Sequence, residues 1–137
     1  MNKENILETA RFVYRGYSNS SLEFWQCVSL VDRYEKNIII IKEKGKIKGV
    51  SFYLLIDDIA LLRLKTFVWK SNNHNDFKEL IARKGNNLHF LGVVADGPSI
   101  ILKGLKKLIK KYNPKTVSWF KQDYLNLRMI KGGDKSG

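Results

Sequence analysis

The sequence predicts one α/β domain, and three observations support this fold class. The chain has 137 residues and a mass of 15.9 kDa, the size of one ordinary domain. Hydrophobic residues make up 44% and charged residues 28%, a balance typical of globular proteins with a packed core. Segments with helical spacing of apolar residues alternate with β-branched runs, and no repeat or Pro-rich linker divides them. We expect the domain to cover residues 1–131 and the glycine-rich tail 132–137 to be disordered.

The first 35 residues predict two amphipathic helices. Apolar residues recur at helical spacing from Ile6, and Gly16 is expected to end the first helix. Ser20-Ser21-Leu22-Glu23 fits a capping box, in which a hydroxyl and a glutamate satisfy free amides at a helix start. The second helix is expected to run to about Glu35. Its buried face would carry Phe24, Cys27, Val31 and Tyr34.

A β-hairpin is expected next. Residues 37–42 are rich in isoleucine, residues 43–46 contain a glycine and resemble a turn, and residues 47–56 form a second extended run. Asp57-Asp58 closes the hairpin. Residues 59–69 are apolar with two basic interruptions, and their pattern fits either a third strand or a short helix followed by a strand.

Helices and strands alternate in the second half of the chain. Residues 76–84 have helical spacing, and residues 87–95 read as a buried strand. Asp96-Gly97-Pro98-Ser99 follows directly and leads into a helix over residues 99–112, which Asn113-Pro114 ends. Residues 116–120 form a further strand. The helix is expected to bury Ile101, Leu105, Leu108 and Tyr112 and to expose Lys103, Lys106, Lys107, Lys110 and Lys111.

The charge of the chain is strongly positive and uneven. The formal net charge is +12, and residues 101–137 alone carry ten basic and two acidic side chains. Such an excess favours polyanions or phosphate-bearing ligands as partners. The basic C-terminal quarter also contains aromatic residues, a mixture found in nucleic-acid-binding proteins, although no known nucleic-acid motif accompanies it.

Other classes of site find little support in the sequence. Cys27 is the single cysteine, which excludes an intramolecular disulfide and a cysteine-based zinc cluster, and its place on an apolar helix face predicts burial. The N-terminus lacks the apolar core of a signal peptide, and no apolar run approaches the roughly 20 residues of a membrane span. We therefore expect a cytoplasmic protein without membrane insertion. No Walker loop, zincin motif or nucleophile elbow is present.

The segment from Leu88 to Phe120 consists of strand, glycine turn, helix and strand. Such a turn places unpaired amides of a helix start at the carboxyl end of a strand, where donors and helix dipole attract phosphate. The same pattern also fits a plain strand-helix-strand crossover, because proline is favoured at the first helical position regardless of function. Local sequence leaves both interpretations open.

The succession of elements resembles the GCN5-related N-acetyltransferase family over roughly residues 3–130. The family's acyl-coenzyme A loop, Gln/Arg-x-x-Gly-x-Gly/Ala, falls on Val94-Ala95-Asp96-Gly97-Pro98-Ser99. Gly97 matches the pattern, Ser99 replaces its second glycine and Val94 its first residue. The resemblance implies an acyl-CoA N-acyltransferase-like fold, with a mixed, mainly antiparallel central sheet flanked by helices. It leaves little room for the family's strands after Phe120.

The resemblance also implies a function and its residues. The chain would transfer an acetyl group from acetyl-CoA to an amine of a protein or small molecule. Backbone groups of Leu91 to Val93 would pair with the pantetheine arm, and the amides of Gly97 and Ser99 would hold the pyrophosphate. Lys103, or another lysine of the same helix, would meet a phosphate. Tyr124 occupies about the place of the family's proton donor.

The general base and the function class stay open. Asp57, Asp58, His89 and Asp96 are candidate bases, and no spacing singles one out; a histidine in an apolar strand is more often a structural residue with a hydrogen bond. The alternatives to an enzyme are a basic nucleic-acid-binding domain and a non-catalytic scaffold with the same fold. A second subunit could complete the acceptor site, so a homo-oligomer is also compatible with the sequence.

Overall fold

The computed structural model describes residues 1–16, 22–69, 73–120 and 127–131. Its elements agree closely with the sequence-based expectations in order and type. Within these residues, no helix is both long enough and apolar enough to cross a membrane. In chain order the elements are α1 (Lys3–Gly16), α2 (Phe24–Arg33), the 3-10 turn η1 (Glu35–Asn37), β1 (Ile38–Glu43), β2 (Lys46–Ile56), α3 (Asp58–Lys65), α4 (His74–Ala82), β3 (Asn87–Ala95), α5 (Pro98–Tyr112), β4 (Thr116–Phe120) and β5 (Leu127–Lys131).

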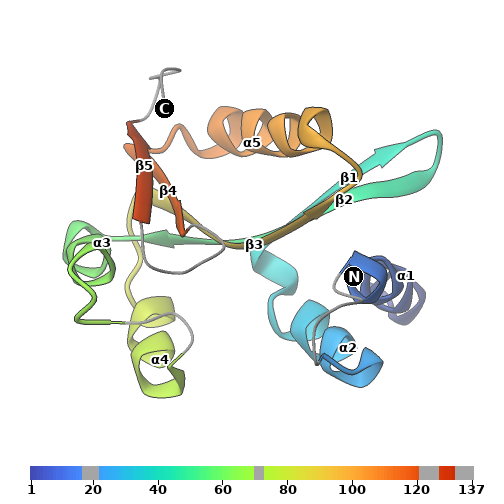
Figure 1. The fold of residues 1–137 in the computed structure, drawn as a ribbon, viewed down its shortest axis with the longest axis horizontal. Coiled ribbons are helices and arrows are strands. Elements are labelled where there is room, and N and C mark those ends of the chain that lie inside the picture. The colour runs from blue at the N-terminus through green and yellow to red at the C-terminus, as the bar shows by residue number, and fades with distance from the viewer. Residues whose placement is uncertain (17–21, 70–72, 121–126, 132–137) are drawn as a thin grey trace. The chain divides into compact units, whose positions relative to one another are not determined.

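The strands form one mixed sheet in the order β1-β2-β3-β4-β5 (Figure 1). β1 pairs with β2 and β4 with β5 in antiparallel fashion, whereas β3 and β4 are parallel. The predicted mixed sheet with flanking helices is therefore confirmed, and β5 is a strand that the sequence reading left little room for. The described chain divides into two compact units, which we call unit 1 (Met1–Phe52 and Gly92–Lys107) and unit 2 (Tyr53–Leu91 and Leu108–Gly137). The prediction of a single domain stays a prediction.

Unit 1 is built around the predicted hairpin. Lys44 and Gly45 both have positive φ, 52° and 77°, which is the backbone of a two-residue hairpin turn and explains the glycine there. Within this unit α1 and α2 lie on one face of the hairpin and α5 on the other (Figure 1). The end of α1 approaches β3 so closely that a Cβ on Gly16 would lie 2.0 Å from Cγ1 of Val94.

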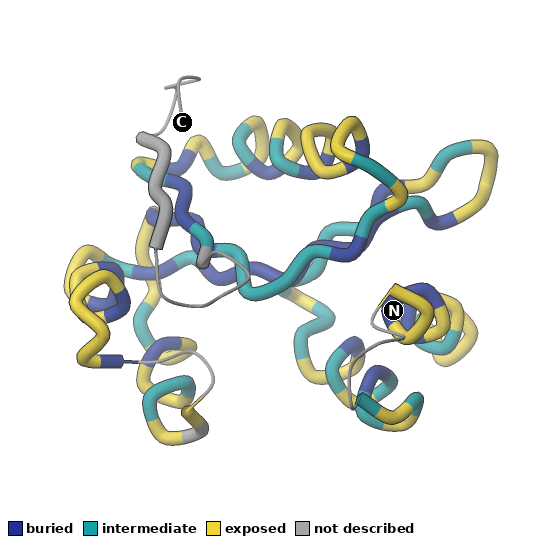
Figure 2. Tube along the Cα trace, viewed as in Figure 1, coloured by how far each residue is buried: buried dark blue, intermediate teal, exposed yellow. Residues whose placement is uncertain are grey.

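The buried face of α5 differs from the predicted one. Ile100, Gly104 and Leu108 are buried, whereas Ile101 is 47% exposed. Gly104 faces β1, because a Cβ at this position would meet Ile41 at 3.8 Å. Gly104 therefore lies on the covered face of the helix, in ordinary contact with the sheet. Along α5, buried and exposed turns alternate in Figure 2.

The start of α2 also differs from the prediction. The residue that precedes the helix is Glu23, whose backbone N–H donates to Oε1 of Gln26 at 2.7 Å. The capping pair is thus Glu23 and Gln26 rather than the predicted serine and Glu23; Ser20 and Ser21 lie outside the described residues. The predicted apolar face is confirmed at Cys27 and Val31, which are buried, and burial raises the pKa of the Cys27 thiol.

The structure of unit 2 shows which element is formed by residues 59–69, which the sequence pattern left undecided. Residues 58–65 form α3, and the carboxylate of Asp57 accepts the N–H of Ala60 at 2.8 Å, as a helix cap does. Because residues 58–65 are helical, the third-strand alternative was wrong; of the other alternative the helix is confirmed, but residues 66–69 form a turn rather than the expected strand. One side of α3 packs in the hydrophobic core of unit 2, which consists of Leu54, Ile56, Ala60, Leu61, Leu64, Trp69 and Leu80, with Phe77 and Leu91 against it.

Candidate functional site

β3 is longer than its described pairing with β4 and leads directly into α5. The parallel pairing with β4 runs from Asn87 opposite Thr116 to Phe90 opposite Trp119, whereas β3 itself continues to Ala95. The part of β3 from Leu91 to Ala95 lies beyond these four pairs. Leu91 and Val93, predicted to contact a cofactor arm, lie in this part of β3 and are half-buried.

The turn between β3 and α5 leaves two backbone donors available. Gly97 has φ 130°, a conformation that favours glycine, and a Cβ built there would meet no atom within 4 Å. Its carbonyl oxygen accepts the N–H groups of Ile100 and Ile101 at 3.2 and 3.4 Å. Pro98 has no N–H, so in the described part of the chain the amides of Gly97 and Ser99 are the donors that this helix start offers to an anion.

An acidic residue lies next to this turn and has a cationic partner. The N–H of Asp96 donates to the carbonyl of Lys48 at 2.9 Å, and the Lys48 ammonium lies 3.8 Å from the Asp96 carboxylate. Both side chains are partly exposed, so the ion pair contributes little to stability. It does offset the negative charge that Asp96 places beside the Gly97 turn.

Lys103 already has a carboxylate partner. Its ammonium donates a hydrogen bond to Glu43 of β1, and this bond lowers the pKa of the Glu43 carboxyl. Both partners are partly exposed. The predicted contact of Lys103 with a phosphate would therefore compete with Glu43, a partner that sequence reasoning did not foresee because the two lie 60 residues apart.

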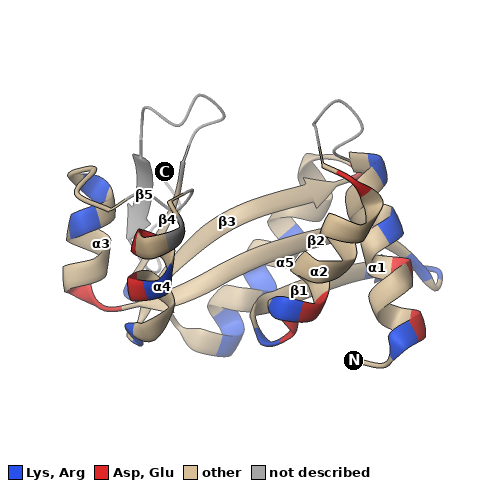
Figure 3. Ribbon diagram, turned by 90° about the horizontal axis from the view of Figure 1, so that it is seen from below, with Lys and Arg blue, Asp and Glu red and all other residues tan. Residues whose placement is uncertain are grey.

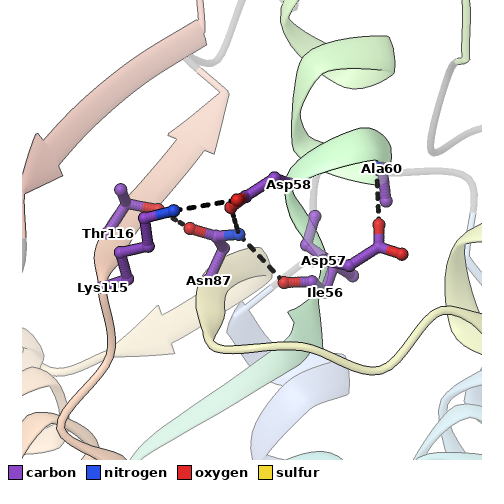
Figure 4. Close-up of polar contacts among 7 residues, drawn as sticks. All are labelled: Ile56, Asp57, Asp58, Ala60, Asn87, Lys115 and Thr116. Atoms are coloured by element: carbon purple, nitrogen blue, oxygen red, sulfur yellow. Dashed lines mark hydrogen bonds and ion pairs between the residues drawn. The ribbon is translucent and has the colours of Figure 1, made fainter.

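Two of the candidate bases have structural roles in unit 2. Asp57 caps α3 and lies 3.3 Å from the guanidinium of Arg83. Asp58 accepts hydrogen bonds from Lys115 at 2.8 Å and from Asn87 at 2.9 Å, as Figure 4 shows. The bond from Lys115, followed by that from Asn87, lowers the pKa of the Asp58 carboxyl. Both carboxylates therefore already have partners within unit 2.

His89 is the structural histidine that its place in an apolar strand favoured. It is fully buried, and its Nδ1 lies 2.8 Å from Oγ of Ser118. Burial lowers the pKa of His89 to about 4, so the ring is neutral at pH 7. A side chain without exposed surface cannot meet a substrate in this conformation. The predicted proton donor Tyr124 lies outside the described residues.

Unit 1 contains a pocket of 610 Å³ that sequence reasoning missed. Three segments line it: α1, the start of β2 with the hairpin turn, and the end of β3 from Val93 to Asp96. A signal was available, because Glu8, Phe12 and Arg15 recur on one face of α1 at spacings of four and three residues. What lies opposite that face depends on tertiary structure.

Comparisons with known proteins identify the fold. No protein-family model matches the sequence, and no curated protein matches it. Among solved structures, the loading GNATL domain of CurA from Lyngbya majuscula aligns over 84% of this chain with TM-score 0.54 and 13% identity. The chain spans 61% of that domain's length. An N-acetyltransferase from Staphylococcus aureus Mu50 aligns over 87% of this chain and 68% of its own, with TM-score 0.51 and 11% identity. The chain thus has the predicted fold of the GCN5-related N-acetyltransferases.

Proposed function

We propose that this protein binds acetyl-CoA and transfers its acetyl group to an amine of a protein or small molecule. The observation that supports this most is the run from the end of β3 into a glycine turn, with the amides of Gly97 and Ser99 at the start of α5. The shared fold adds to it, since acetyltransferase structures are among those that align with the chain. The proposal therefore combines a candidate cofactor site at the β3–α5 turn with the fold of the GCN5-related N-acetyltransferases.

The residues at this turn suit an anionic cofactor. The amides of Gly97 and Ser99 would hold the pyrophosphate, and the open space beside Gly97 leaves room for it. Backbone groups of Leu91 and Val93 would pair with the pantetheine arm as a neighbouring strand would. Lys103 would contribute a phosphate contact by exchanging Glu43 for the ligand.

Acetyl-CoA supplies a thioester, and an amine that attacks its carbonyl carbon forms a C–N bond while the C–S bond breaks. In our proposal the protein holds both substrates together, so that attack is direct. Tyr124 would protonate the departing thiolate, and the proton of the amine would pass to a base or to water. His89 is buried, and Asp57 and Asp58 have structural partners, so none of these three is proposed as the base.

Calorimetry with acetyl-CoA tests the cofactor site. We expect saturable binding that Gly97→Ala weakens by about tenfold or more, because a side chain there disturbs the donors of the turn. Gly45→Ala is the matched control, since Gly45 also has positive φ and open space at its Cβ but belongs to the hairpin turn. No binding at millimolar acetyl-CoA would refute the proposal. Binding without release of free thiol in the presence of amines would indicate a non-catalytic scaffold.

The role of Tyr124 has a separate test. Tyr124→Phe removes the phenolic hydroxyl and should lower kcat by about a hundredfold near neutral pH with little change in KM. The pH profile of kcat should lose its alkaline limb at the same time. Unchanged turnover across pH would assign proton donation to another group or to water.

A nucleic-acid-binding domain is the second candidate, and the exposed lysines of α5 favour it. Lys106, Lys107, Lys110 and Lys111 are all exposed, and basic segments recur along this helix in Figure 3. Steeply salt-dependent binding of an oligonucleotide, without affinity for acetyl-CoA, would support this function instead.

A further inference from the structure

The pocket of unit 1 has the size and lining of a small-molecule site. Its volume of 610 Å³ falls within the range of about 300–1,000 Å³ that ligand pockets occupy. Phe12, Ile47 and Val94 contribute apolar surface from α1, β2 and β3, and each is at most 9% exposed. An occupant with an apolar body would displace water from this surface.

The charged lining of the pocket is mostly positive. Lys48 is paired with Asp96, so these two charges offset each other. Arg15 and Lys46 are exposed, and neither forms an ion pair with another described residue. The Nε of Arg15 donates to the Arg11 carbonyl at 3.4 Å, so the terminal nitrogens of the Arg15 guanidinium and the Lys46 ammonium are the groups that would meet a ligand.

Glu8 is the remaining acid of the lining. It lies on α1 seven residues before Arg15, which is about 10 Å along the helix axis. Both acidic (red) and basic (blue) segments are present on α1 in Figure 3. An anion beside Arg15 and Lys46 would therefore gain two attractive contacts and keep its distance from Glu8.

We propose that this pocket binds an organic anion with an apolar body, with the anionic group at Arg15 and Lys46. The binding claim stands on the pocket alone. A second step rests on the proposed function: because Val93 to Asp96 line the pocket and also lead into the proposed cofactor turn, the bound anion would lie beside acetyl-CoA and would be its acceptor. The acceptor class would then be an amine that also carries a carboxylate or phosphate.

Titration of the full, isotope-labelled chain with three probes of equal chain length tests the binding claim by NMR. Octanoate and octyl phosphate should shift the amide signals of Gly16, Lys46 and Val94 to saturation. Octylamine should bind at least about threefold more weakly, because it presents a cation to the same lining. Octyl phosphate tighter than octanoate would point to phosphate as the natural group, and the reverse order to carboxylate. Octylamine binding as tightly as both anions would overturn the proposal.

Charge substitutions give effects of opposite sign. Arg15→Gln and Lys46→Gln should each weaken octanoate binding by about two- to fivefold, the size of a partly exposed ion pair. Glu8→Gln should strengthen it, because a like charge is removed. Arg11→Gln is the control, since Arg11 is an exposed cation of the same helix that does not line the pocket. Equal weakening by Arg11→Gln would show that octanoate responds only to net charge and would overturn the assignment.

Repeating the titration with saturating acetyl-CoA separates this inference from the proposed function. Octanoate binding in the presence of acetyl-CoA supports two adjacent sites, and mutual displacement would overturn them. If octanoate follows the variant pattern while acetyl-CoA does not bind, the proposed function fails and the pocket stands. If acetyl-CoA binds and octanoate does not, the pocket proposal alone fails.

Discussion

At the scale of single residues, one buried asparagine connects three segments of unit 2. Asn87 is 1% exposed; its side chain donates to the Ile56 carbonyl at 3.1 Å and to Asp58 at 2.9 Å, and accepts from the Thr116 hydroxyl at 2.7 Å (Figure 4). The sequence marks Asn87 only as the polar start of a strand. Its role depends on partners 29 to 31 residues away, which local pattern does not reveal.

Asn87→Ala should destabilise the fold, because it leaves the buried Ile56 carbonyl and the half-buried Thr116 hydroxyl without this partner. We expect the free energy of unfolding to fall by about 2 kcal/mol. The neighbouring Asn86→Ala is the control, since Asn86 makes an exposed bond of 3.2 Å to the Asn113 carbonyl and should cost under about 1 kcal/mol. Urea denaturation of both variants measures the difference; equal losses would contradict the role of Asn87.

His89 should make stability depend on pH. Its folded pKa of about 4 lies below the ordinary value near 6.5, so the unfolded chain binds a proton more readily. The neutral His89 ring therefore contributes to the free energy of unfolding in full above pH 6.5. This contribution, about 3 kcal/mol in all, is lost as the pH falls toward 4. His89→Gln removes the titrating ring, so its unfolding free energy should change less over this window. If the unfolding free energy of the unaltered protein and of His89→Gln changes with pH in the same way, His89 is not the cause of the pH dependence.

At the scale of elements, the sequence pattern predicted a helix or strand correctly where the element carries a local signal of its type. The hairpin, β3 and β4 were predicted because extended runs of apolar, β-branched and aromatic residues, and the glycine of the hairpin turn, are local signals. Residues 59–69 stayed undecided because α3 buries Ala60, Leu61 and Leu64 while Ile59 and Leu62 are exposed, so its sequence is apolar on both sides. Helical periodicity cannot be read when the outer face is apolar as well.

Two glycines should respond to alanine with opposite signs. At Gly104 of α5 a Cβ would make ordinary contacts of 3.7 Å or more, so Gly104→Ala should stabilise the fold by about 0.5–1 kcal/mol through helix propensity. At Gly85 a Cβ would lie 2.4 Å from backbone atoms of Ile56 and Asp57, so Gly85→Ala should cost about 2 kcal/mol or more. Thermal melts of both variants measure the shifts, and shifts of equal sign would contradict this account.

At the scale of the whole molecule, net charge and fold suggest different partners. The charge of +12 favours polyanions in general, whereas the glycine turn at the start of α5 favours a ligand with few phosphates. Substituting glutamine for Lys106, Lys107, Lys110 and Lys111 would reduce the formal charge to +8 without altering the turn. This variant separates the two functions.

We expect the four-lysine variant to bind acetyl-CoA within about twofold of the unaltered protein, because none of these lysines belongs to the proposed cofactor site. Its binding of an oligonucleotide should weaken, with the slope of log affinity against log salt reduced by about 0.7 for each lost phosphate contact. Calorimetry at two salt concentrations measures both. A large loss of acetyl-CoA affinity would show that the cofactor contacts the four substituted lysines of α5 rather than the turn at Gly97.

The sequence by itself determined the order of most elements and the glycine turn, because periodicity, turn residues and proline stops act over a few neighbouring residues, whereas the mixed sheet was expected only from the family resemblance. Tertiary structure alone decided the buried face of α5, the partner of Lys103, the structural use of Asp57 and Asp58, and the pocket beside α1. Each of these depends on which surfaces meet across tens of residues of chain. Hydrophobic burial is not directional, so a local pattern shows that a face is covered without showing what covers it.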